Sequence, residues 1–103
     1  MNFTQDEIED ALETIRSRVP QTPAYAWPLL AKRAGLEVIV KHENHTPPGS
    51  FKARGGLVFI ERLRRKQLPP GLVTATRGNH GQSIAMGAKL SDVSAYGTDL
   101  MFS

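Results

Sequence analysis

The chain has 103 residues, the size of one small domain, with 40% hydrophobic residues and a formal net charge of +3. It contains no cysteine, which excludes disulfides and thiolate metal sites, and no apolar run is long enough to cross a membrane. We therefore expect a globular, cytoplasmic protein with no membrane partner.

The first predicted helix begins after Thr4, because Thr4 and Glu7 form a capping-box pattern. Its apolar residues recur at helical spacing: Ile8, Ala11, Leu12, Ile15 and Val19. Pro20 is expected to end this helix. A short second helix is predicted from Pro28 to Gly35, since proline favours the first turn of a helix and glycine its end.

The middle of the chain is predicted to alternate strand and helix. The apolar run 38–40 is typical of a strand buried on both faces, and residues 44–49 read as a loop. Ser50 is the expected N-cap of a helix that runs to about Gln67. A second strand is predicted over residues 72–75, a tight turn over 76–78 and a helix from Asn79 through Ala88. This order predicts an α/β fold with parallel strands and flanking helices.

Two segments that follow the predicted strands carry residues suited to chemistry, because ligands of open α/β folds bind at the carboxyl ends of strands. In the first segment, Lys52 lies in the first turn of its helix, where the positive end of the helix dipole favours the neutral, nucleophilic amine. Phe51 beside it offers a flat apolar face. For an isolated lysine, however, a solvated surface position is the more common interpretation.

The second segment, 74–82, has features of an anion site. Gly78 permits close backbone approach, and the helix that follows presents free N–H groups to an anion. Thr76 adds a hydroxyl, and the Asn79 amide can donate a hydrogen bond. An alternative of equal weight is that Asn79 only caps the helix and that His80 is a surface residue.

Other binding functions are weakly supported. The chain has neither a P-loop lysine nor a complete G-x-G-x-x-G pattern, and its three histidines lack the spacing of metal ligands. The basic run Arg62, Arg64, Arg65 and Lys66 is not interleaved with aromatic residues, so a solvated helix face is a better interpretation than a nucleic-acid site.

Together the two segments resemble a known pair of motifs. Residues 49–55, Gly-Ser-Phe-Lys-Ala-Arg-Gly, resemble the cofactor-lysine motif of the fold type II, or tryptophan-synthase-like, pyridoxal-phosphate (PLP) enzymes. Residues 76–82, Thr-Arg-Gly-Asn-His-Gly-Gln, resemble the asparagine loop of the same family. The resemblance extends to about Lys89 and implies the N-terminal part of a three-layer α/β fold.

The resemblance also implies roles for individual residues. Lys52 would hold PLP through a Schiff base and later move the Cα proton, with Phe51 packed near the cofactor ring. Asn79 would bind the 3′-oxygen of the cofactor. Thr76, Asn79 and His80 would bind the carboxylate of an amino-acid substrate.

Asn-His-Gly resembles the dehydratase and racemase branch more than the cysteine synthases. Serine racemases carry a serine where this chain has Arg77, which favours dehydration of L-threonine or L-serine to a 2-oxo acid and ammonia. Serine racemase and threonine synthase remain alternatives within the fold. A homo-oligomer is expected for the full-length form.

The resemblance ends before the end of the chain. Residues 1–89 would form the N-terminal part of a dehydratase-like domain, and after Ala88 the family pattern implies a glycine and an apolar strand. Residues 90–103 contain no strand-like apolar run, so we expect a divergent tail that arises from truncation or a frameshift. The glycine-rich phosphate loop of the family would also lie beyond residue 103. We therefore expect this chain alone to have little activity, and a non-catalytic fragment that associates with a full-length subunit is a further alternative.

Overall fold

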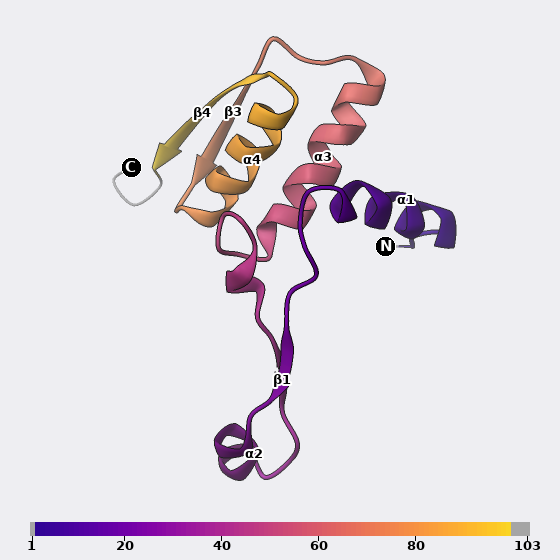
Figure 1. Cartoon of the computed structure of the whole chain (residues 1–103). Coiled ribbons are helices and arrows are strands. Elements are labelled where there is room, and N and C mark those ends of the chain that lie inside the picture. The colour runs from indigo at the N-terminus through magenta and orange to yellow at the C-terminus, as the bar shows by residue number, and fades with distance from the viewer. Residues whose placement is uncertain (1, 100–103) are drawn as a thin grey trace.

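The computed structural model describes residues 2–99 and consists of a helical body, a parallel strand pair and a projecting arm (Figure 1). In chain order the elements are α1 (Gln5–Arg16), β1 (Ala24–Ala26), α2 (Pro28–Ala34), β2 (Ile39–Lys41), the 3-10 turn η1 (Glu43–His45), α3 (Lys52–Lys66), β3 (Gly71–Thr76), α4 (Asn79–Leu90) and β4 (Ser94–Asp99). Within these residues no helix is long and apolar enough to cross a membrane.

The two N-terminal helices begin where the sequence predicts, and α2 also ends as predicted, but α1 ends at Arg16, before the predicted stop at Pro20. Thr4 Oγ1 accepts a hydrogen bond from the Glu7 backbone N–H, and the Glu7 carboxylate accepts one from the Thr4 backbone N–H, so the capping box is complete. Pro28 is the first residue of α2, and Gly35 ends it with φ 74°, in the left-handed region that favours glycine.

The body is built on the contact between α3 and α4, which lie side by side (Figure 1). Gly56 of α3 packs against Ser83 of α4, and Gly87 of α4 packs against Ile60 of α3. These glycines let the two backbones approach closely. The core lies at this contact and under α1, with Val19, Ala53, Leu57, Ile60, Ile84 and Ala88 buried.

Strands β3 and β4 pair in parallel, in a register that joins Gly71 to Ser94 and Thr76 to Asp99, and α4 connects them. This β–α–β unit, with α3 packed on α4, confirms the predicted α/β fold with parallel strands and helices.

The arm consists of β1, α2 and β2, and it projects from the body (Figure 1). Strands β1 and β2 pair antiparallel, with Tyr25 opposite Val40. The sequence did not predict β1, because residues 21–23 read as a connector and the strand is only three residues long. The prediction that strand 38–40 is buried on both faces was wrong. Strand β2 spans Ile39–Lys41, and Ile39 is 65% exposed because no described element covers that face.

Two further features differ from what the sequence predicted. Ser50 is not the N-cap of α3: Phe51 occupies that position, while the buried Ser50 hydroxyl has no hydrogen-bond partner in the described part of the chain. The sequence also did not predict a strand in residues 90–103, but β4 forms there by backbone pairing with β3 rather than by an apolar run. Before β4, Asp92 adopts φ 56°, a backbone conformation that usually favours glycine. Residues 100–103 lie outside the described residues.

Candidate active site

Lys52 is the first residue of α3, and its side chain is exposed. None of the ion pairs formed within residues 2–99 involves this lysine. Its amine is therefore accessible for reaction at the start of a helix.

A cavity of about 420 Å³ opens beside Lys52. Phe51 and Lys52 line it from the start of α3, and His80, Ser83 and Ile84 line it from α4. Its volume falls within the range typical of small-molecule sites, roughly 300–1,000 Å³. Three of the five residues predicted from the sequence, Phe51, Lys52 and His80, thus meet at one cavity.

The other two predicted residues lie on the turn between β3 and α4. Thr76 ends β3 and lines a second hollow of about 380 Å³ together with Gly78 and Gly81. Asn79 is the first residue of α4, and its side chain is exposed. The structure therefore does not bring Thr76 into the hollow that Lys52 lines.

The Thr76 hydroxyl shapes this turn. Its oxygen accepts hydrogen bonds from the backbone N–H groups of Gly78 (2.9 Å) and Gly81 (2.8 Å). A Cβ atom on Gly81 would lie 2.5 Å from Thr76 Cγ2, so only glycine fits there without a shift. Because the Thr76 oxygen is the acceptor in both bonds, its hydroxyl proton is still free to be donated to a ligand.

The sequence analysis missed a set of charged and polar residues around Arg54, two residues after Lys52. Arg54 donates two hydrogen bonds to the Glu43 carboxylate, from Nε to Oε2 (2.7 Å) and from Nη2 to Oε1 (2.9 Å). The hydroxyl of the buried Thr22 donates to the same carboxylate, and Lys41 Nζ lies 3.3 Å from it. Arg54 belongs to the motif that contains Lys52, but nothing in the sequence indicated Glu43 as its partner.

This arrangement lowers the pKa of Glu43 from 4.5 to about 2, chiefly because Arg54 hydrogen-bonds to the charged carboxylate. A carboxylate whose pKa is depressed in the folded state stabilises the fold above its unfolded pKa, and that contribution is lost as the pH falls through the folded value. We therefore expect Glu43→Gln to lower the free energy of unfolding at neutral pH, and the difference from the parent chain to shrink between pH 4.5 and about 2. Urea unfolding of both chains across this pH range measures it. A difference that stays constant down to pH about 2 would contradict the assignment.

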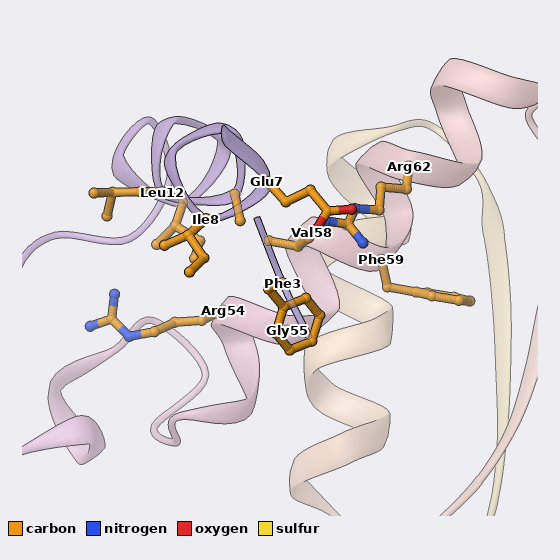
Figure 2. Close-up of a pocket in the computed structure, with 11 residues that line it drawn as sticks. Phe3, Glu7, Ile8, Leu12, Arg54, Gly55, Val58, Phe59 and Arg62 are labelled. Atoms are coloured by element: carbon orange, nitrogen blue, oxygen red, sulfur yellow. The ribbon is translucent and has the colours of Figure 1, made fainter. Parts of the chain in front are cut away.

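A larger hollow of about 590 Å³ lies between α1 and α3 (Figure 2). Its walls are mostly apolar, with Phe3, Ile8 and Phe59 among them, and its ionisable groups are Glu7, Arg54 and Arg62. Figure 2 shows these side chains around the opening. Because this hollow contains no amine or imidazole, we place the candidate active site at the smaller cavity beside Lys52.

The fold and the site together define a class of protein. A parallel β–α–β unit carries a loop at the carboxyl end of β3, and an accessible lysine at the start of α3 shares a cavity with a histidine of α4. This is the arrangement of an α/β enzyme that binds a small ligand between loop and helix start.

Comparison with known proteins identifies the family. The family model of pyridoxal-phosphate-dependent enzymes matches residues 15–97, and the chain belongs to that family. This match continues beyond Lys89, the predicted limit of the resemblance, and includes most of β4.

The relatives include both lyases and racemases. The chain is 35% identical over 89 residues to the biosynthetic L-threonine dehydratase of Lactococcus lactis, and the alignment covers 86% of this chain and 21% of that protein. It is 35% identical over 92 residues to the serine racemase of Schizosaccharomyces pombe, and that alignment covers 89% of this chain and 28% of that protein. A crystal structure of a PLP-dependent aspartate racemase superposes with a TM-score of 0.82 at 32% identity, over 96% of this chain and 32% of that one. The chain thus spans between about a fifth and a third of the length of these relatives.

The residues present fit the ring and aldehyde end of PLP. Lys52 supplies an accessible amine, and Phe51, which is 62% exposed, supplies an aromatic face at the same cavity. The Ser50 hydroxyl, two residues before Lys52, is buried and has no partner within the described residues, as expected for a polar group whose ligand is missing. Lys52 and Phe51 are therefore the residues lining this cavity that would hold the cofactor.

Proposed function

We propose that this chain is the N-terminal part of a PLP-dependent ammonia-lyase that converts L-threonine or L-serine to a 2-oxo acid and ammonia by β-elimination. The observation that carries the proposal is the cavity at which Lys52, Phe51 and His80 meet. The threonine dehydratase among the relatives supports the choice of reaction.

Each residue has a role that its chemistry permits. PLP, when bound, supplies an electron sink for the charge that develops at the substrate Cα. The Lys52 amine accepts the Cα proton as a general base. His80 and the Asn79 amide donate hydrogen bonds to the substrate carboxylate, with the Thr76 hydroxyl proton as a third donor. Phe51 and Ile84 give the cavity apolar walls.

Arg77 favours elimination over racemisation. Racemisation requires a second group that exchanges a proton with Cα on the opposite face of the substrate. Serine racemases, by resemblance, place a serine at the position of Arg77, whereas a guanidinium remains protonated and cannot accept a proton. A chain with arginine here is therefore expected to lack that second base.

The reaction can be tested in a hybrid enzyme, because this chain spans only part of its relatives. In the hybrid, the chain replaces the aligned 89 residues of the Lactococcus lactis threonine dehydratase. We expect it to form 2-oxo acid from L-threonine and L-serine at a rate at least about tenfold above that of D-serine formation. Coupled assays of oxo acid and D-serine on the same sample measure the ratio. Formation of D-serine as the main product would contradict the proposal and favour a serine racemase.

A further inference from the structure

We propose that Glu43, Arg54, Thr22 and Lys41 form a clasp that positions Lys52 for the cofactor, an inference that rests on the proposed function. The clasp joins three segments of the chain: Thr22 before the arm, Lys41 and Glu43 at and just after its end, and Arg54, the second residue beyond Lys52 in α3. In this role Glu43 and Arg54 are positioning residues, since they act through Lys52.

The first turn of α3 has little stability of its own. Phe51, at the N-cap, makes no side-chain capping hydrogen bond, so the helix start lacks the stabilisation that such a bond gives. Gly55 and Gly56 follow within the next turn, and glycine disfavours helix relative to alanine. The orientation of the Lys52 side chain at this helix start therefore depends on contacts made from outside α3.

Two nested closures hold the loop that leads into α3, and the outer one, made by the clasp, encloses Lys52 within residues 43–54. The outer closure is the two-bond contact between Arg54 and Glu43. The inner closure is made by the buried Thr46, whose hydroxyl donates to the Ser50 carbonyl (2.7 Å) and accepts from the Ser50 N–H (2.9 Å). Both ends of the loop that leads into α3 are therefore held.

The direction of the two side chains on α3 completes the argument. Arg54 follows Lys52 by two residues in α3, and it also lines the cavity that Lys52 lines. Figure 2 shows Arg54 extending from α3, away from Phe3 and Phe59. When its guanidinium is fixed on Glu43, the rotation of the first turn is fixed, and Lys52 is held at its cavity.

The test compares two arginines of α3 that make similar bonds. Arg54→Lys keeps the charge but removes the two-bond fork to Glu43, and Glu43→Gln keeps the shape but removes the charge. Arg65→Lys is the matched control, because Arg65 makes a two-bond contact with Asp10 (2.8 and 3.0 Å) that joins α3 to α1 far from Lys52 in the helix. Circular dichroism establishes that each 103-residue variant is folded.

Two measurements then decide the proposal. Hydrogen exchange at amides 51–55 is expected to accelerate about tenfold in Arg54→Lys and Glu43→Gln, and to stay within about twofold in Arg65→Lys. After incubation with PLP and borohydride reduction, the share of adduct on Lys52 relative to the other lysines is expected to fall at least about fivefold in the same two variants only.

The outcomes separate this proposal from the proposed function. Unchanged exchange at 51–55, or unchanged tagging of Lys52 despite faster exchange, would show that the clasp only braces the fold. Absence of tagging at Lys52 in the parent chain would instead refute the proposed cofactor lysine. The exchange measurement would then decide alone whether the clasp orders the start of α3.

Discussion

Replacing Lys52 with alanine in the hybrid enzyme is expected to lower the rate of 2-oxo acid formation by at least about 100-fold. The substitution removes both the amine that would attach the cofactor and the base that would accept the Cα proton. Within residues 2–99 of this chain, no other lysine lines the cavity beside α3. Rates of oxo acid formation at saturating L-threonine and PLP measure the effect.

Lys66→Ala provides the control, because Lys66 is the exposed last residue of the same helix. This variant is expected to retain activity within about twofold, since surface substitutions away from a site have small effects. If Lys52→Ala retained activity within the same twofold range as Lys66→Ala, the assigned role would be excluded.

Gly56→Ala is expected to destabilise the chain by about 1–3 kcal/mol, the usual cost of overpacking a close contact. A Cβ atom at this position would lie 2.6 Å from Ser83 Oγ and 2.9 Å from the Ser83 backbone oxygen. The backbone atom cannot move aside as a side chain could, so α3 and α4 must separate. Thermal or urea unfolding of the two chains measures the loss.

Gly55→Ala is a matched control with the opposite expected sign. It adds the same methyl group to the same helix one residue earlier, where no other part of the described chain comes within 4 Å of the added atom. Because alanine favours helix over glycine by about 1 kcal/mol, this variant is expected to be more stable than the parent chain. Equal destabilisation by both substitutions would mean that the α3–α4 contact is not as close as described.

Local patterns predicted much of this fold because their physical causes are local. The capping box at Thr4, the proline and glycine around α2, and the alternation of helix and strand after Gly35 all act over a few residues. The same holds for the segments that carry Lys52 and His80. Each follows a strand in the sequence, and the packing of α3 on α4 then brings the two residues to one cavity.

Features that depend on distant partners could not be predicted. Strand β1 is three residues long and exists because β2 pairs with it, and β4 forms by pairing with β3 although its own sequence is not apolar. The ion pair between Glu43 and Arg54 depends on how the loop before α3 folds back. Ser50 had the right residue type for an N-cap, but the start of the helix falls one residue later than the pattern indicated.

The most direct test of the cofactor assignment is the position of a covalent tag on the parent chain. The purified 103-residue chain is incubated with PLP, reduced with borohydride, digested and mapped by mass spectrometry. The chain has five lysines, Lys32, Lys41, Lys52, Lys66 and Lys89. We expect the pyridoxyl group predominantly on Lys52. A tag spread evenly over the five lysines, or concentrated on another of them, would contradict the proposed role of Lys52.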